Sequence, residues 1–474
     1  MKPVAIIGGG ISGLTAAFRL QQQGIPATIY ETGARVGGVI RSIREDGYLA
    51  EFGPNSVLET SPVIGSLIRD LKLEGRRCYS DPRAENRYLV RGHKLILLPS
   101  SPPAFFASPL FSWGAKLRLC AEPFIRRAPA AVEESLAQFV VRRLGQEFLD
   151  YAINPLVAGV YAGDPAQLSV REAFPKLHAL EQKYGSLILG QFLGARERKR
   201  RGEVAKDAAP KFSFGLGLQE LIDTFESRLL SGLKLSTHVL EVEKRVDRWT
   251  ISFESGGQVG AADHSAVLCA LPAYRMAELN ITADRPVNLT SLAGIHYPPV
   301  ASVVLGFRRE DVAHPLDGFG MLIPEKENLR ILGSIFSSSL FPNRAPLGHV
   351  TITSYVGGCR APALAQEGRD QIFATVLKDL SILLGVKGQP TYRHLAVFPK
   401  AIPQYELGFG HYRELMARAE TTAPGLFIAG HARDGISLGD SIVSGDRAAT
   451  RIAGFLGREG EAARVPPAPL EAAA

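Results

Sequence analysis

The sequence has few cysteines and no histidine cluster, and each shortage excludes a class of site. Four cysteines, Cys78, Cys120, Cys269 and Cys359, are scattered among 474 residues without a C-x-x-C pair. The sequence therefore predicts neither a disulfide framework nor a zinc site. None of the ten histidines belongs to an H-E-x-x-H or similar ligand pattern, so we expect no metal. The scattered cysteines are typical of a protein from a reducing cytosol.

Long apolar runs are also missing. No stretch of about 18 apolar residues, the length that a membrane-spanning helix needs, occurs in the chain. The start, Met1-Lys2-Pro3, lacks the apolar stretch and the cleavage site of a signal peptide. We therefore expect a cytoplasmic protein that does not cross a bilayer, while attachment to a membrane surface stays open.

The charge balance is modestly basic. A net charge of +7 favours an anionic partner, and nucleic acid, anionic lipid and small carboxylate-bearing molecules all qualify. The run "RERKRR" at 196–201 is interpreted as a solvated loop, because nucleic-acid targeting would need more than one such run. We predict no nucleic-acid partner.

A glycine-rich turn near the N-terminus carries a strong functional signal. The pattern Gly8-x-Gly10-x-x-Gly13 follows a predicted strand and opens a predicted helix, which is the context of a dinucleotide-binding βαβ unit. Glu31 ends the next strand, 18 residues after Gly13, where a carboxylate can accept hydrogen bonds from ribose hydroxyls and repel a 2′-phosphate. The residues predicted to approach the pyrophosphate are Gly8, Gly9, Gly10, Ile11, Ser12 and Gly13. The pattern predicts FAD or NAD and disfavours NADP.

A second motif near the C-terminus has two interpretations. Residues 435–439, "GISLG", match the G-x-S-x-G turn that exposes a serine nucleophile in hydrolases. That chemistry requires a histidine later in the chain, but the last histidine, His431, precedes Ser437. We therefore interpret the segment as a loop into a helix that begins near Leu438, with Ser437 as a cap and with a helix N-terminus that attracts negative charge.

Further residues give a resemblance to a known family. The pattern Glu31-x-x-x-Arg35-x-Gly37-Gly38 resembles the extended fingerprint of the FAD-dependent amine oxidase superfamily, which favours FAD over NAD. The motifs that narrow the resemblance are "EFGPNS" (51–56), "NRYLV" (86–90), "LLPSSPPAF" (97–105), "NPLVAGVYAGDPAQLSVREAFPKL" (154–177), "GSLILG" (185–190), "FSSSLFPNRAP" (336–346), "AIPQYELGFGH" (401–411) and "RDGISLGDSIVSG" (433–445). Together they resemble the oxygen-dependent protoporphyrinogen oxidase and coproporphyrinogen III oxidase family, over nearly the whole chain.

This resemblance implies a reaction. A porphyrinogen is oxidised to a porphyrin in three two-electron steps by non-covalently bound FAD, and oxygen reoxidises the flavin. We expect protoporphyrinogen IX as the substrate, with coproporphyrinogen III as the alternative. More distant alternatives on the same fold are an amine oxidase, a carotenoid desaturase or a lipid-binding protein without cofactor. No acid–base catalytic residue is assigned, because positioning the macrocycle against the flavin is most of the task.

The resemblance also implies residue roles. Arg87 holds a propionate, Leu322, Ile335 and Tyr355 pack on the macrocycle, and Gly159 approaches a pyrrole ring. Taken singly, these residues would be a surface arginine, core side chains and a loop glycine. Besides the glycine turn and Glu31, the implied cofactor residues are Arg35, Gly37, Gly38, Gly53, Pro54, Asn55, Ser56, Val239, Ile436, Ser437 and Leu438.

One position departs from the family pattern. The Gly-Asp that is common near the end of the superfamily is Gly430-His431 here. Asp434 or Asp440 could supply the missing acid toward the flavin ribityl chain.

The predicted fold is α/β with three domains. It combines a discontinuous Rossmann-like FAD-binding domain, an α+β substrate-binding domain and a helical membrane-binding insertion. Their boundaries are 1–81, 206–285 and 405–474 for the first, 286–404 for the second and 82–205 for the third.

The insertion has an interfacial or a core interpretation. Its aromatic and aliphatic residues lie near basic ones, which suits a segment at a lipid surface and suits equally the core of a helical domain. They are Phe105, Phe106, Leu110, Phe111 and Trp113, near Lys116, Arg118, Arg126 and Arg127. The resemblance favours peripheral attachment to the inner face of the cell membrane, and it allows a homodimer.

Overall fold

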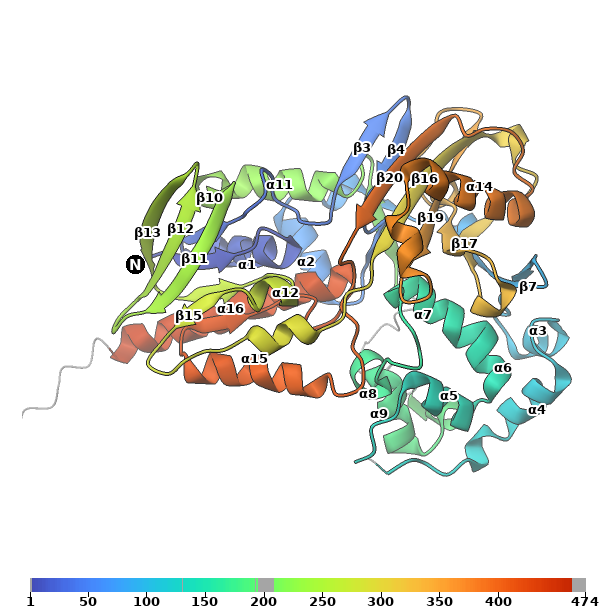
Figure 1. Ribbon diagram of the computed structural model, residues 1–474, viewed down its shortest axis with the longest axis horizontal. Coiled ribbons are helices and arrows are strands. Elements are labelled where there is room, and N and C mark those ends of the chain that lie inside the picture. Colours follow the sequence, from blue (N-terminus) through green and yellow to red (C-terminus); the bar gives the residue numbers. More distant parts are fainter. Residues whose placement is uncertain (1, 130, 192, 195–208, 463–474) are drawn as a thin grey trace, which may run out of the picture. The chain divides into compact units, whose positions relative to one another are not determined.

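The computed structural model describes residues 2–129, 131–191, 193–194 and 209–462. The chain divides into two compact units (Figure 1). Unit 1 is assigned Met1–Gly38, Ile222–Gly294 and Tyr412–Ala474, and unit 2 is assigned Val39–Leu221 and Ile295–His411. The three predicted domains, with their boundaries, stay a prediction.

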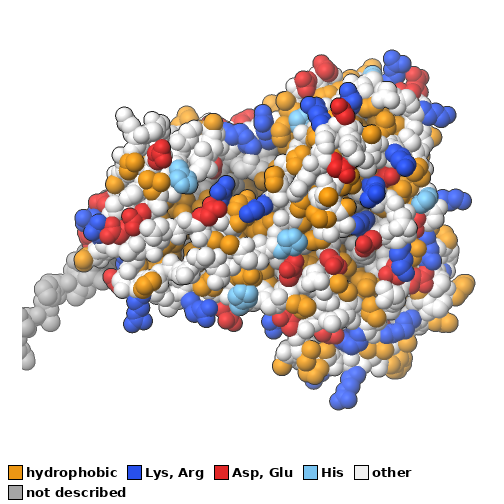
Figure 2. Space-filling model, viewed as in Figure 1, with side chains coloured by type: hydrophobic (Ala, Val, Ile, Leu, Met, Phe, Trp, Pro, Cys, Tyr) orange, Lys and Arg blue, Asp and Glu red, His pale blue; other side chains and the backbone are white. Residues whose placement is uncertain are grey.

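The charges are mixed on the surface that is visible in Figure 2. Lys and Arg side chains alternate there with Asp and Glu, so the net charge is not gathered in one basic patch on that face. The basic run at 196–201 lies outside the described residues.

Unit 1 is built on a five-stranded parallel sheet in the order β10-β2-β1-β14-β21. Its strands are β10 (Leu233–Lys234), β2 (Ala27–Tyr30), β1 (Val4–Ile7), β14 (Val267–Cys269) and β21 (Leu426–Ile428). Every residue of β1 is buried, as a continuous apolar run requires when helices cover both faces of a parallel sheet. The predicted mixed α/β fold with a parallel sheet is confirmed.

Two helices of unit 1 pack side by side, α1 (Ile11–Gln22) and α16 (Leu438–Ala462) (Figure 1). A Cβ at Gly445 of α16 would lie only 2.3 Å from the carbonyl oxygen of Ser12, so glycine permits this close crossing. Helix α1 follows β1, and α16 follows β21 through residues 429–437. Both helices therefore begin at the carboxyl edge of the parallel sheet.

A second sheet of unit 1 has the order β13-β12-β11-β15. Its strands are β13 (Gln258–His264), β12 (Trp249–Ser255), β11 (Thr237–Lys244) and β15 (Asn280–Thr282). Unit 1 also contains α12 (Ala273–Met276) and most of two further helices, α11 (Gln219–Leu229) and α15 (Gly410–Thr422).

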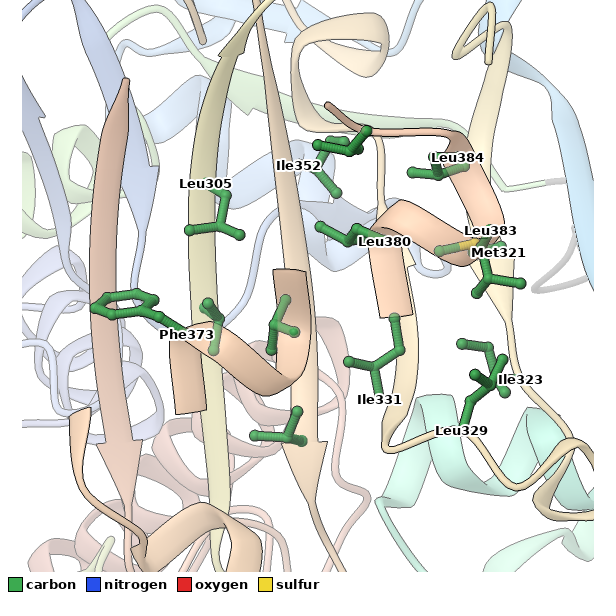
Figure 3. Packing of buried hydrophobic residues seen from close by; sticks show 14 of the residues in the cluster. Leu305, Met321, Ile323, Leu329, Ile331, Ile352, Phe373, Leu380, Leu383 and Leu384 are labelled. Carbon is green, nitrogen blue, oxygen red and sulfur yellow. The ribbon is translucent and has the colours of Figure 1, made fainter. Parts of the chain in front are cut away.

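Unit 2 is built on a mixed seven-stranded sheet in the order β20-β16-β19-β18-β17-β7-β8. Its strands are β20 (Tyr392–Phe398), β16 (Val300–Arg308), β19 (His349–Gly357), β18 (Ile331–Ile335), β17 (Gly318–Leu322), β7 (Asn86–Arg91) and β8 (Lys94–Leu97). Helix α14 (Arg369–Leu384) covers one face, where Phe373 and Leu380 pack on Leu305, Ile331 and Ile352 (Figure 3). We name the opposite side the front face.

Smaller elements accompany this sheet. The hairpin β3 (Ser42–Glu45) and β4 (Tyr48–Glu51) packs on the front face through Tyr48, which stacks on Tyr392 at 4.8 Å between ring centroids. A three-stranded sheet joins β5 (Val57–Leu58), β9 (Lys211–Phe214) and β6 (Arg77–Tyr79). Helices α2 (Pro62–Asp70) and α13 (Ser337–Leu340) also belong to unit 2.

The segment predicted as a helical insertion begins differently. Strands β7 and β8 form a hairpin at 86–97 that joins the seven-stranded sheet, and their short continuous apolar runs at 88–90 and 95–97 are consistent with strands. Helices follow, namely α3 (Pro102–Ala107), α4 (Trp113–Cys120), α5 (Leu136–Arg143), α6 (Gln146–Phe148), α7 (Asn154–Tyr161), α8 (Val170–Ala173) and α9 (Pro175–Tyr184). None of the described helices is both long and apolar enough to cross a bilayer.

Candidate functional site

The glycine turn of unit 1 has the geometry of a phosphate-binding loop. Gly8 adopts a φ of +107°, and a Cβ there would lie 2.6 Å from the carbonyl oxygen of Ala270. A Cβ at Gly13 would lie 2.1 Å from the carbonyl oxygen of Gly8, whereas a Cβ at Gly10 would meet no atom within 4 Å. The first and third glycines are thus required by packing, and the second leaves the backbone open to a ligand.

Glu31 is fixed beside this turn. Its Oε2 accepts a hydrogen bond from the Gly9 N–H at 2.8 Å, and its Oε1 accepts one from the Gly33 N–H at 2.7 Å. A carboxylate offers about four lone-pair positions, so Glu31 can still accept hydrogen bonds from ribose hydroxyls. The Thr237 N–H donates to the Glu31 carbonyl oxygen at 2.9 Å. Thr237 is the first residue of β11, the strand that carries Val239, so this strand begins next to Glu31.

Arg35 and the second glycine pair form a compact loop against the first turn. The Gly37 N–H donates to the Gly9 carbonyl at 2.8 Å. The Arg35 guanidinium donates to the carbonyl oxygens of Val36 at 2.9 Å and of Gly38 at 2.7 Å. Gly37 and Gly38 have φ values of +100° and +56°, which favour glycine. Arg35 therefore shapes the loop that carries the two glycines.

The N-terminus of α16 confirms one interpretation of the C-terminal motif. Ser437 Oγ accepts a hydrogen bond from the Asp440 N–H at 3.0 Å, and Asp440 Oδ2 accepts one from the Ser437 N–H at 3.4 Å. This is a capping box. The helix begins at Leu438 as predicted, with Ile436 directly before the cap. Ser437 is a helix cap, and the hydrolase interpretation is not needed.

Asp434 and Asp440, the two acids that could replace the one missing at His431, both accept hydrogen bonds from nearby residues of the same segment. Asp440 belongs to the capping box, and Asp434 accepts a hydrogen bond from Ser444 Oγ. The Gly430 N–H donates to the same Ser444 Oγ at 2.8 Å. Burial lowers the pKa of His431 to about 4, so its imidazole is neutral near pH 7. The residue in the place of the usual acid adds no charge.

These parts of unit 1 fit a flavin dinucleotide. Ser12 Oγ in the first turn of α1 donates to the carbonyl oxygen of Ser441 in the first turn of α16 at 2.9 Å. Two helix N-termini, each with a positive dipole end, therefore converge at one edge of the sheet. Gly10 leaves the backbone exposed at the start of α1. No group of three or more metal-binding side chains occurs among the described residues.

The predicted substrate residues of unit 2 share the front face of the seven-stranded sheet. Arg87 pairs with Gly320 and Gly320 with Ile335, while Leu322 pairs with Gly333 and Gly333 with Tyr355. Residues directly opposite one another on neighbouring strands project from the same face. Arg87, Leu322, Ile335 and Tyr355 therefore project from one face of four neighbouring strands, and Arg87 is exposed.

Helix α7 brings Gly159 to the same face. A Cβ at Gly159 would lie 2.5 Å from Leu322 Cδ2, so any side chain there would have to displace the end of the Leu322 side chain. Ala158 and Ala162 pack in one cluster with Tyr355. The structure thus places Gly159, Leu322 and Tyr355 in one packed wall.

The segment Gly53–Ser56 also lies at this face. Asn55 Nδ2 donates to Tyr355 Oη at 2.6 Å, and the ring of Phe52 lies 4.3 Å from that of His394. A Cβ at Gly53 would lie 2.6 Å from the carbonyl oxygen of Val39. Pro54 and Ser56 flank Asn55. Burial raises the pKa of Tyr355, so its phenol stays protonated.

An ion pair that no local sequence pattern indicates holds this segment. The buried Arg344 donates to Glu51 Oε1 at 3.4 Å, and Glu51 also accepts hydrogen bonds from Ser42 Oγ at 2.5 Å and from the Leu218 N–H at 3.0 Å. Burial raises the pKa of Glu51, and Arg344 opposes that shift. Both residues belong to motifs that were noticed, but a pairing across 293 positions has no local signal.

The structure separates the two interpretations of the insertion residue by residue. Leu110 and Phe111 are buried, and Phe105 packs in the same cluster. Lys116 is also buried, because its Nζ donates to the carbonyl oxygens of Phe106 and Ser108. The core interpretation therefore holds for these four residues.

Other apolar residues of the insertion are exposed. Trp113 is 66% exposed, Leu117 67% and Phe124 89%. Figure 2 shows hydrophobic side chains among Lys and Arg at the lower right, where α3 and α4 lie. The last two residues were not singled out in the sequence, because their neighbours give no sign of which helix face is covered.

Comparison with known proteins agrees with these features. The profile of the family described as flavin containing amine oxidoreductase matches residues 11–453. A mitochondrial protoporphyrinogen oxidase from Nicotiana tabacum is 35% identical over 96% of this chain and 95% of the relative. Protoporphyrinogen oxidase 2 from Arabidopsis thaliana is 34% identical over 96% and 94%. Coproporphyrinogen III oxidase from Bacillus subtilis is 28% identical over 96% and 98%.

Solved structures show the same fold. A crystal structure from Exiguobacterium sp. 255-15 matches with a TM-score of 0.79 and 23% identity, covering 96% of this chain and 99% of its own. Reduced UDP-galactopyranose mutase matches with a TM-score of 0.72 and 15% identity, covering 96% of each chain. The chain belongs to the flavin-containing amine oxidoreductase family, and within it is a flavoprotein oxidoreductase of the porphyrinogen oxidase family.

Proposed function

We propose that this protein oxidises protoporphyrinogen IX to protoporphyrin IX, with FAD held non-covalently and with O₂ as the final electron acceptor. The observation that carries the proposal is the front face of unit 2. Arg87, Leu322, Ile335 and Tyr355 project from one face of four neighbouring strands, and Gly159 of α7 packs against Leu322.

This face suits the chemistry of the substrate. A porphyrinogen is a flexible apolar macrocycle with carboxylate arms, and its site needs apolar walls and a cation at one end. Leu322, Ile335 and Tyr355 supply the walls. The exposed Arg87 supplies a forked cation that suits a propionate.

The residues expected to hold FAD contribute backbone groups, one carboxylate and a helix N-terminus. Gly8, Gly10 and Gly13 would hold the pyrophosphate, Glu31 the ribose, and the N-terminus of α16 the negatively charged part of the reduced flavin. FAD held there would supply the two-electron acceptor for each of the three oxidations, with oxygen as the final acceptor. The protein itself orients the macrocycle, and neither the neutral His431 nor the protonated Tyr355 adds a charge.

We place protoporphyrinogen before coproporphyrinogen III because of the charge in the register rows that carry the predicted substrate residues. Two rows of paired positions across the described strands contain the predicted substrate residues of the sheet. In these two rows Arg87 is the one residue with a guanidinium or ammonium group. Protoporphyrinogen has two propionates and coproporphyrinogen has four, so the second substrate would place more carboxylates against apolar surface. Coproporphyrinogen III is the second candidate, because the Bacillus subtilis relative carries that name.

Anaerobic bleaching of the flavin tests this proposal. The purified protein is mixed in parallel with protoporphyrinogen and with coproporphyrinogen, and the loss of flavin absorbance is followed. We expect faster bleaching by protoporphyrinogen. Faster bleaching by coproporphyrinogen would reverse the substrate choice, and a yellow protein that neither compound bleaches would contradict the proposed function.

We also propose that the protein attaches peripherally to a membrane. The exposed Trp113, Leu117 and Phe124 support this, together with the exposed Arg126 and Arg127 nearby. Apolar side chains that enter the headgroup region and cations that attract anionic lipid act together in such segments.

A further inference from the structure

Arg360 is a partly buried arginine of unit 2 for which the motifs assign no role. It follows β19, the strand that carries Tyr355. Its Nη1 donates to the Ile323 carbonyl at 3.0 Å, and its Nη2 donates to Asn154 Oδ1 at 3.0 Å. Burial lowers the pKa of Arg360, and Glu325 opposes that shift. The Arg360 guanidinium donates both of these hydrogen bonds to groups of the protein itself.

These bonds tie the start of α7 to the end of β17. Asn154 is the first residue of α7, and Ile323 directly follows Leu322, the last residue of β17. The same amide also engages Glu325, because Asn154 Nδ2 donates to Glu325 Oε2 at 3.1 Å and Asn154 Oδ1 accepts the Glu325 N–H at 3.0 Å.

The residue before Arg360 holds the other end of the helix. The Cys359 N–H donates to the Ala162 carbonyl at 2.7 Å. Ala162 ends α7 in a left-handed conformation with a φ of +50°. Gln404 Nε2 adds a hydrogen bond to the Tyr161 carbonyl at 2.8 Å. Two consecutive residues, Cys359 and Arg360, thus clamp both ends of α7.

The clamp sets the wall of the proposed substrate site. Gly159 of α7 touches Leu322 without room for a Cβ, and Ala158 packs in the cluster of Tyr355. A shift of α7 would move these contacts together. Small displacements of groups that orient a substrate weaken its productive binding strongly.

We propose that Arg360 is a positioning residue for porphyrinogen binding: its guanidinium fixes α7 against β17 and so holds Gly159, Leu322 and Tyr355 in one rigid wall. This inference rests on the proposed function of that face. Arg360 acts through α7, and it takes no part in the oxidation itself.

The variant Arg360→Met tests the inference, since it keeps an unbranched apolar stem but removes both donors. We expect KM for protoporphyrinogen to rise about tenfold while kcat changes less than about threefold, since two hydrogen bonds from a charged donor are lost. FAD content should match the wild type. Arg360→Lys should restore part of the KM. Arg330→Met, which changes an exposed arginine of the loop between β17 and β18, should behave as wild type.

Hydrogen exchange gives a readout that does not depend on turnover. We expect faster amide exchange in α7 of Arg360→Met, and the same effect at smaller size in Asn154→Ala, which serves if the first variant does not fold. Unchanged KM together with unchanged exchange in α7 would overturn the inference. If the wild type oxidises no porphyrinogen, the proposed function fails, whereas faster exchange would still show the clamp.

Discussion

Single residues decide whether the two proposed ligand-binding surfaces can form at all. Gly13 permits α1 to approach the glycine turn, because a Cβ there would lie 2.1 Å from a carbonyl oxygen that cannot move aside. Arg87 supplies the guanidinium in the rows of the front face that carry the predicted substrate residues. Gly13 acts by having no side chain, and Arg87 acts through its charge.

Replacement of Arg87 tests the carboxylate interaction. We expect Arg87→Ala to lower kcat/KM for protoporphyrinogen about tenfold to a hundredfold, because a charge-assisted hydrogen bond is lost. Photoreduction of the flavin without substrate should not change. The control Arg83→Ala removes an exposed arginine that pairs with Asp81 at 2.6 Å, and it should keep wild-type kinetics. Unchanged kcat/KM in the first variant would remove Arg87 from the site.

Replacement of Gly13 tests the glycine turn. We expect Gly13→Ala to lose most of its FAD and to be destabilised by about 1–3 kcal/mol or more, because the added methyl group overlaps backbone. The ratio of flavin to protein absorbance and the thermal midpoint measure both effects. Gly454→Ala in α16, where a Cβ meets no atom within 4 Å, should bind FAD normally and gain about 1 kcal/mol. Full FAD content in Gly13→Ala would contradict the role of the turn.

Among the elements, the helices around α5 are joined by a buried network of charges. Arg143, fully buried, donates to Glu181 at 2.7 Å and to Glu122 at 3.0 Å. Burial by itself raises the pKa of Glu181, but hydrogen bonds from Arg142 and Arg143 outweigh it and lower the pKa. Glu122 also accepts the Leu187 N–H at 2.9 Å.

Removal of this arginine should loosen the helices together. We expect Arg143→Met to lower the free energy of unfolding by about 3–5 kcal/mol, because Glu122 stays buried without its cation and Glu181 keeps Arg142 alone. Urea denaturation measures the loss, and hydrogen exchange should locate it in α5 and α9. Arg126→Met, at an exposed position of the same region, should change stability by less than about 0.5 kcal/mol. A small effect in Arg143→Met would show that apolar packing alone holds these helices.

Over the whole molecule, buried neutral histidines make stability depend on pH. His264 is 1% exposed, its Nε2 bonds with Tyr30 Oη at 2.8 Å, and burial lowers its pKa from 6.5 to about 4. Between these two values the unfolded chain binds a proton that the folded protein does not bind. Stability is therefore complete above pH 6.5 and falls as the pH decreases toward 4.

The contribution of His264 can be measured separately. We expect the wild type to lose up to about 3 kcal/mol through this group between pH 6.5 and 4. His264→Gln should be less stable at pH 7 and should show a shallower loss over this range. His238→Gln, at an exposed position, should keep the wild-type slope. Equal slopes in all three proteins would contradict the lowered pKa of His264.

The proposed attachment to a membrane is also tested on the whole molecule. We expect Trp113→Glu combined with Phe124→Glu to reduce co-sedimentation with phosphatidylglycerol vesicles at least about tenfold, because two large apolar side chains are lost from the contact. Two exposed valines of unit 1 give a matched control, Val246→Glu with Val259→Glu. This control should sediment as wild type. Equal sedimentation of both double variants would exclude the proposed contact.

Features that depend on neighbours in sequence could be predicted. The glycine turn, Glu31 at the end of β2 and the start of α16 at Leu438 follow from local rules for turns, strands and caps. Roles on the front face could not be predicted from local rules and came from a family resemblance. Arg87, Ile335 and Tyr355 share one face only because of the register of four strands. Register depends on pairing between distant segments.

The sequence by itself determined the dinucleotide turn, the parallel sheet behind it and the capped helix that faces the same edge, because each arises within a few residues or one strand–helix–strand unit. Only the tertiary structure decided which apolar residues of the insertion are core and which are surface, and which distant residues clamp α7. Burial and long-range hydrogen bonds are set when separate segments pack together, and no short window of sequence contains both partners.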